Sequence, residues 1–134
     1  DAGLDTGAML ATISCPISAR TTAAELYDKL ALLGPPLLQQ VLADIERVMD
    51  SAQGDWLAGG GRGSYADLSL FHLVDGLLYA FPKRMVSVSA RYPKVMALHE
   101  RMANLPALQD YFASGRRLPF GDGIFRYYPE LDGK

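Results

Sequence analysis

Three residues carry the thiol and imidazole groups of this sequence, which commonly act as nucleophiles or zinc ligands: Cys15, His72 and His99. A cysteine becomes reactive beside a base or a cation, and no base stands within sequence reach of Cys15, so we interpret it as an inert thiol. The two histidines lie far apart and lack the further ligands of a zinc site. We interpret His72 as a hydrogen-bonded core residue and His99 as a solvent-facing residue.

A glycine-rich run, GGGRG at residues 59–63, has the composition of a phosphate-binding loop. Such a loop follows a strand and is followed by a lysine, and neither pattern occurs here. We interpret the run as a tight loop that lets Trp56 and Leu57 pack inward.

Ser64 and Asp67 carry the clearest helix-start signal, in the run GSYADLSLF. Ser64 is an N-cap, and the Asp67 carboxylate at the third helical position can accept a backbone N–H and oppose the helix dipole. The helix that follows is apolar in nearly every direction as far as Phe81, where Pro82 ends it. Because it is too short to span a bilayer, the pattern predicts a central core helix.

In the first third of the chain, the residue pattern predicts a strand and a helical hairpin. Residues 9–17 alternate weakly between apolar and polar side chains. A capping box of Thr22 and Glu25 begins a first helix, Gly34 ends it, and Pro35 and Pro36 begin a second helix that runs to about residue 50.

The last third predicts two short helices and a tail. Residues 83–91 are interpreted as a loose connector with one helical turn. Pro93 opens one helix and Pro106 the last one. The tail from residue 118 is rich in aromatic side chains, so we expect it to lie back on the domain.

Composition excludes several classes of function. The formal charge is −2, with 13 basic and 15 acidic residues that are scattered along the chain, so no nucleic-acid partner is expected. No apolar run reaches the roughly 18 residues of a membrane span, and no export signal is seen. One cysteine suits a reducing compartment, which predicts a cytoplasmic protein of one domain.

Residues from about 43 to 134 resemble the C-terminal helical domain of cytosolic glutathione transferases. The resemblance rests on the runs GDWLAGG, SYADLSLFHLVDGLLYAFP, RYPKVMALHERMANLPALQDYFASGRRLPF and GIFRYYPELDG. It implies a mainly α, compact helical bundle. It also implies that the wall of a hydrophobic-substrate site falls on Phe81, Met85, Phe120 and Tyr127, with core or dimer contact as the alternative. The family's thiol-activating residue belongs to a thioredoxin-like domain, whose βαβ pattern is missing from this sequence.

Residues 1 to about 42 resemble a segment of methionyl-tRNA formyltransferase, on the runs DAGLDTGAML, SCPIS and TTAAELYDKLALLGPPLL. The resemblance implies a strand and two helices and places a family catalytic aspartate at Asp5. That family's Asn and His lie upstream of this segment, so we interpret Asp5 as a turn residue.

Together these patterns predict a chimera-like single domain over residues 1–134 that is not an enzyme and needs no cofactor. We expect Leu37, Val41 and Ile45 to dock on the core helix, and a homodimer or a segment-exchanged oligomer to cover the remaining apolar surface. The alternatives are a degenerate glutathione transferase that still binds glutathione or a hydrophobic ligand, and a formyltransferase fragment.

Overall fold

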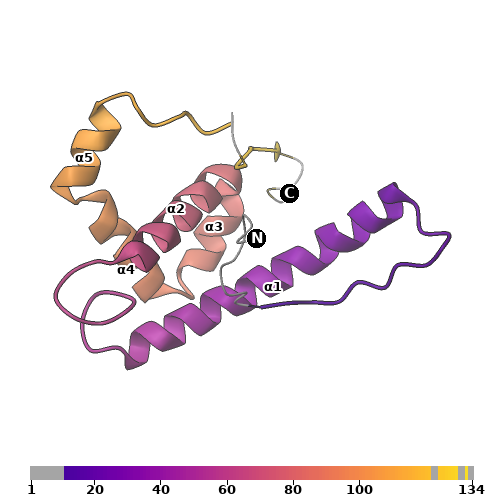
Figure 1. The fold of residues 1–134 in the computed structure, drawn as a ribbon, viewed down its shortest axis with the longest axis horizontal. Coiled ribbons are helices and arrows are strands. Elements are labelled where there is room, and N and C mark those ends of the chain that lie inside the picture. The colour runs from indigo at the N-terminus through magenta and orange to yellow at the C-terminus, as the bar shows by residue number, and fades with distance from the viewer. Residues whose placement is uncertain (1–10, 122–123, 130–131, 133–134) are drawn as a thin grey trace, which may run out of the picture. The chain divides into compact units, whose positions relative to one another are not determined.

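The fold was analysed in a computed structural model, which describes residues 11–121, 124–129 and 132. Over these residues the chain forms five helices and no strand (Figure 1). The helices are α1 (Ala23–Ser51), α2 (Tyr65–Ala80), α3 (Pro82–Ser89), α4 (Pro93–Ala103) and α5 (Pro106–Ala113). The predicted mainly α fold is confirmed.

The chain divides into two compact units, Asp1–Asp44 and Ile45–Lys134. The division lies within two residues of the join that the sequence resemblances place after residue 42. Helix α1 runs through the division, so its last turns belong to the second unit. Each unit is described by itself.

Helix α1 begins at the predicted capping box. The Thr22 N–H donates to the Glu25 carboxylate at 2.9 Å, and the Glu25 N–H donates back to the Thr22 hydroxyl at 3.3 Å. The predicted hairpin is wrong, because α1 continues through Pro35 and Pro36 without a break. Each proline removes one backbone donor, but its fixed φ is itself helical. The leucine-rich segments on both sides therefore stay in one helix.

The predicted N-terminal strand is wrong over residues 11–17, which have no regular secondary structure. Residues 9 and 10 of that prediction lie outside the described part of the chain. A strand needs a hydrogen-bonded neighbour, and the described residues offer no other strand to pair with. A turn closed by the Thr21 N–H and the Ser18 carbonyl, at 3.0 Å, leads into α1 instead.

The core of the second unit lies where α2 packs on α4 and α3. Its most deeply buried apolar residues are Leu98, Val95 and Val74, which expose 0%, 1% and 1% of their surface. On α2 the buried apolar side chains are Leu70, Phe71, Val74, Leu77 and Ala80. The opposite face of α2 is open, with Leu68 and Tyr79 exposed by 41% and 38%. Helix α2 is therefore the predicted core helix, and it is buried on one face.

Helix α3 replaces the predicted connector. Pro82 ends α2 and is also the first residue of α3, which runs for eight residues and buries Met85. Proline is favoured at that position because the first N–H of a helix has no intrahelical acceptor. None of the helices in the described part of the chain has the length and apolarity that a bilayer span requires.

Candidate functional site

Asp67 is the most connected buried side chain of the second unit. Ser64 and Asp67 form a capping box at the start of α2, and the Asp67 side chain is fully buried. Its Oδ2 accepts the Ser64 N–H and the Ser64 hydroxyl, both at 2.7 Å, and its Oδ1 accepts the Leu57 N–H at 2.7 Å. The carboxylate therefore holds the 52–63 loop against the first turn of α2.

The protonation of Asp67 follows from these bonds. Burial raises the pKa of the carboxyl group, because it penalises the charged form. Hydrogen bonds from the Leu57 N–H, the Ser64 hydroxyl and the Ser64 N–H outweigh this effect, so the pKa lies below its ordinary value. Asp67 is thus a structural carboxylate that stays ionised, and it is unsuited to act as a general acid near neutral pH.

Two more acidic residues cap helices in the same way. Glu46, at the end of α1, accepts the Lys94 N–H at 2.8 Å and the Val95 N–H at 2.9 Å, in the first turn of α4. Asp132, in the C-terminal tail, is fully buried and accepts two N–H groups of the first turn of α3, each at 3.1 Å. Both carboxylates satisfy backbone donors that the helix itself leaves unpaired.

A polar cluster joins α2, α4 and the start of the tail. The Asp75 carboxylate contacts His99 Nε2 at 3.1 Å through one oxygen and binds the Arg117 guanidinium through the other. The His99 ring also stacks on Phe71, with centroids 5.0 Å apart. The prediction that His99 faces solvent is wrong, because its side chain is only 16% exposed.

His72 has the solvent exposure that the sequence interpretation gave to His99. It lies on the open face of α2 and is exposed, so its interpretation as a core residue is wrong. Its ring meets Phe125 of the tail edge-on, with centroids 5.5 Å apart. The position of His72 was not predictable because a helix that is apolar almost all round does not reveal which of its faces is covered.

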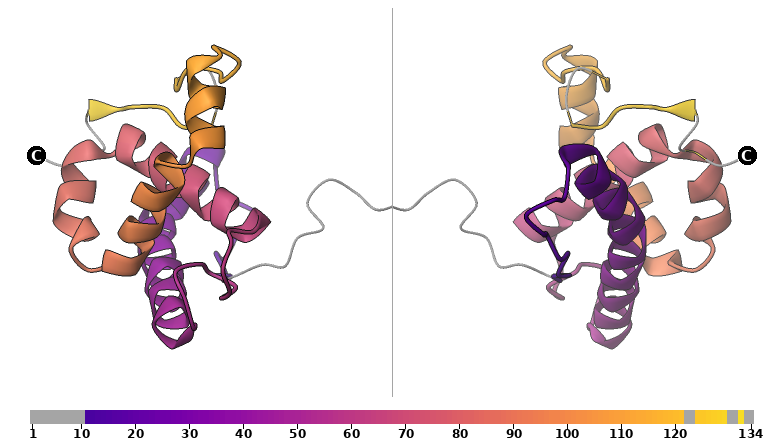
Figure 2. Two further views of the ribbon diagram at one scale, coloured as in Figure 1. Left: turned by 90° about the vertical axis from the view of Figure 1, so that its left-hand side faces the viewer. Right: turned by 90° about the vertical axis from the view of Figure 1, so that its right-hand side faces the viewer.

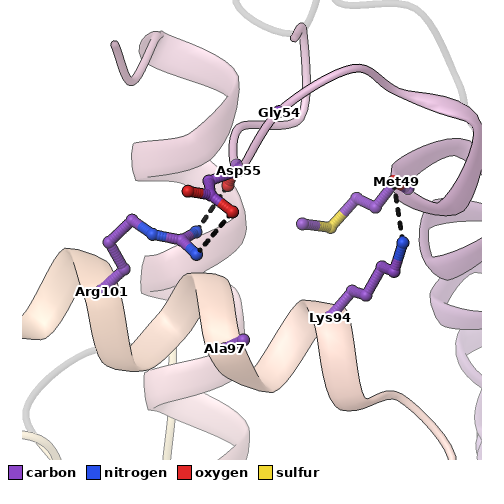
Figure 3. Close-up of a pocket in the computed structure, with 6 residues that line it drawn as sticks. All are labelled: Met49, Gly54, Asp55, Lys94, Ala97 and Arg101. Atoms are coloured by element: carbon purple, nitrogen blue, oxygen red, sulfur yellow. Dashed lines mark hydrogen bonds and ion pairs between the residues drawn. The ribbon is translucent and has the colours of Figure 1, made fainter. Parts of the chain in front are cut away.

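One small pocket of about 120 Å³ lies between α4, the end of α1 and the 52–63 loop (Figure 3). Lys94 and Arg101 project from α4 on either side of Ala97. Lys94 pairs with Asp50 at 2.8 Å, and Arg101 pairs with Asp55 at 3.2 Å. Because acidic neighbours already neutralise both cations, the pocket is not a prepared anion site.

Metal binding finds no support in this geometry. Within residues 11–121, 124–129 and 132, no group of three or more His, Cys, Asp or Glu side chains converges on a point that an ion would occupy. Cys15 is half-buried and has no disulfide partner. The contacts of Asp67, Glu46 and Asp132 are those of a helical scaffold.

The family comparison agrees with this scaffold. A family model described as "Glutathione S-transferase, C-terminal domain" matches residues 25–115, which is more than half of the chain. The chain belongs to this family. The match begins well before residue 43, so the glutathione-transferase-like part of the sequence includes most of α1.

A second likeness concerns a different enzyme. The chain is 53% identical over 45 residues to the methionyl-tRNA formyltransferase of Coxiella burnetii (strain CbuK_Q154). These residues are 34% of this chain and 14% of that enzyme. The resemblance predicted from the sequence is confirmed, and the chain spans only a small part of the formyltransferase.

The four predicted wall residues of this glutathione S-transferase C-terminal domain lie on three different segments. Phe81 is half-buried between α2 and α3, and Met85 is buried on α3. Phe120 is half-buried in the tail and stacks on Tyr79 at 4.9 Å, whereas Tyr127 is exposed by 41%. None of the four lines the pocket in Figure 3, so their role as a substrate wall stays a prediction.

The remaining candidate, Asp5, lies outside the described residues. Sequence reasoning missed Glu46, Asp75 and Asp132. Each meets its partners across 24 to 49 positions of the chain. Their only local signal is a carboxylate within an apolar stretch, which does not reveal the partner.

Proposed function

We propose that this chain is a non-catalytic helical module. It consists of a glutathione S-transferase C-terminal domain joined to a formyltransferase-like segment, and it carries out neither transferase reaction. The supporting observation is the use of its buried acidic groups. Asp67 and Asp132 are fully buried, and their carboxylates accept backbone N–H groups of this domain, which is a structural use of an acidic side chain.

The proposed assembly is a homodimer. Large apolar side chains of the second unit are exposed along one row of α2, with Tyr65 at 83%, Leu68 at 41% and Tyr79 at 38%. Exposed apolar patches of this kind mark interfaces in folded proteins. The proposed location is the cytoplasm, where the single thiol stays reduced.

The alternative is a degenerate glutathione transferase that binds glutathione or a hydrophobic ligand without turnover. The aromatic side chains of Tyr79, Phe120 and Phe125 favour it, because they form one aromatic cluster, with a stacked pair and an edge-on pair, and such a cluster suits a flat apolar molecule. A formyltransferase activity would need Asp5 together with groups that the family places upstream of this segment.

Two measurements test the proposal. Light scattering at low micromolar concentration should give twice the mass of the 14.6 kDa chain. The protein should also pass through glutathione resin unretained and show no thiol conjugation with an aromatic electrophile above buffer. A well-folded monomer would refute the dimer, and measurable conjugation would refute the non-catalytic module.

A further inference from the structure

The open face of α2 holds a seat for one tail side chain. The Phe125 ring lies directly on Gly76, so a Cβ at Gly76 would overlap the ring. The ring is also met edge-on by His72 at 5.5 Å and by Phe120 at 6.0 Å. A side chain at position 76 would therefore displace the ring from this place on α2.

A second anchor fixes the far end of the tail. The buried Asp132 carboxylate accepts the Lys83 and Arg84 N–H groups at 3.1 Å each. Figure 2 shows the tail, in yellow, returning past α2 to the side of α3. The tail is thus held at two points: the Phe125 ring packs on α2, and the Asp132 carboxylate accepts N–H groups of α3.

A turn separates these anchors from the part of the tail that stays near α5. Arg117 lies 4.8 Å from the Phe112 ring and 4.6 Å from the Phe120 ring, which fixes the tail as far as Phe120. The chain then reverses at Gly121, whose φ is 103°, and the turn is closed by the Gly121 N–H and the Phe125 carbonyl at 3.1 Å. The turn joins the part of the tail held at α5 to the part that carries the two anchors, so it is the point at which a tail would cross from one copy of the chain to another.

We propose that residues 124–132 exchange between two copies of the chain, so that Phe125 of each copy occupies the Gly76 seat of the other. Segment exchange keeps the contacts of Phe125 with α2 and of Asp132 with α3, because the incoming segment has the same sequence, and it loses the hydrogen bond that closes the turn at Gly121. The closed form leaves Ile124, Tyr127 and Tyr128 exposed by 86%, 41% and 43%. Bringing two tails together would bury such side chains, which favours the exchanged form.

This inference rests on the homodimer of the proposed function and names the segment that forms it. The test is complementation between two full-length variants. Gly76→Ala closes the seat, and Phe125→Ala removes its occupant, so neither variant alone has a seat and an occupant together. In an exchanged pair of the two, the intact Gly76 of one variant receives the intact Phe125 of the other.

The two variants are given different tags, unfolded and refolded together, and their species are counted by native mass spectrometry. Exchange predicts that the mixed dimer dissociates at least ~10-fold less readily than either variant homodimer, since only the mixed dimer keeps one buried ring. Circular dichroism should show unchanged helix content for Gly76→Ala, because alanine is favoured over glycine in helices.

The outcomes separate the two proposals. If wild type dimerises and the mixture contains no excess of mixed dimer, exchange is overturned and the homodimer stands. If wild type is monomeric at the same concentration, both fall. A matched control pairs Phe125→Ala with Val86→Ala, an exposed position of α3 that leaves Gly76 and Phe125 of its own chain intact. The Val86→Ala chain should dimerise with itself as wild type does.

Discussion

The buried carboxylate of Asp67 gives the most demanding test of the structure. Replacing Asp67 with alanine leaves the Leu57 and Ser64 N–H groups without their acceptor and removes the partner of the Ser64 hydroxyl. We expect this single change to loosen both the 52–63 loop and the first turn of α2, which begins the core helix.

The size of the effect follows from the number of lost bonds. A buried donor left without an acceptor costs about 1–3 kcal/mol. Asp67→Ala leaves two such N–H groups, and the one of Ser64 keeps partial access to water. We therefore expect the free energy of unfolding to fall by about 2–4 kcal/mol. Ser64→Ala removes only the hydroxyl and is expected to cost about 1 kcal/mol. The larger loss is a substantial part of the stability of an ordinary domain, about 5–15 kcal/mol.

Urea unfolding measures both variants. Trp56 is the only tryptophan of the chain, and its ring lies against Gly63 beside the loop that Asp67 holds, so its fluorescence reports this region. Circular dichroism reports the helices independently. Coincident transitions by the two signals would show that loop and helices unfold together.

Acid adds a second prediction for the same residue. The pKa of Asp67 is lower in the folded chain than in the unfolded one, so its stabilising contribution is complete above the unfolded value. This contribution is lost as pH falls below the unfolded value and through the folded pKa. Asp67→Asn should therefore flatten the dependence of stability on pH in the acid range, and leave its slope near neutrality unchanged.

The reasoning would be refuted by the reverse order of effects. If Asp67→Ala shifts the urea midpoint less than Ser64→Ala does, the carboxylate does not hold the loop. A wild-type stability profile in acid that is unchanged by Asp67→Asn would show that the carboxylate gains nothing from its three hydrogen bonds.

Three further predictions concern the second unit. Leu98→Ala should cost about 2–5 kcal/mol by urea unfolding, because the side chain is fully buried, whereas the half-exposed Leu68→Ala should cost less than about 1 kcal/mol; equal effects would contradict the core assignment. Glu46→Ala should cost about 1 kcal/mol and speed amide exchange in the first turn of α4 more than elsewhere. Asp132→Asn should speed amide exchange at the start of α3, and the exposed Asp110→Asn should not; similar exchange in both would contradict the tail anchor.

Local sequence signals predicted much of the fold. Thr22 with Glu25, Ser64 with Asp67, Pro93 and Pro106 each mark a helix start in the structure, because capping and proline geometry act within one turn. The same local reasoning failed at Pro35. It assigned a helix end at Gly34 and the start of a second helix at Pro35, but whether a helix continues through a proline depends on the segments on both sides.

Local sequence signals could not predict which face of a helix is buried. The apolar residues of α2 predicted a core helix without indicating which of its faces the rest of the chain covers, and in the structure one face is buried. The two histidines were affected most: His72 was expected in the core and is exposed, whereas His99 was expected at the surface and is largely buried. A sequence pattern shows that a helix can be buried, and the neighbouring helices decide which side is.

By itself, the sequence determined the mainly α class, the resemblance to two enzyme families and the capped start of the core helix, because these depend on residues within a few positions of each other. Only the tertiary structure decided where Glu46, Asp75, Asp132 and Phe125 act. Their partners on other helices stand 24 to 53 positions away in the chain. A hydrogen bond or a ring contact across such a distance forms only after the chain has folded, so no local pattern records it.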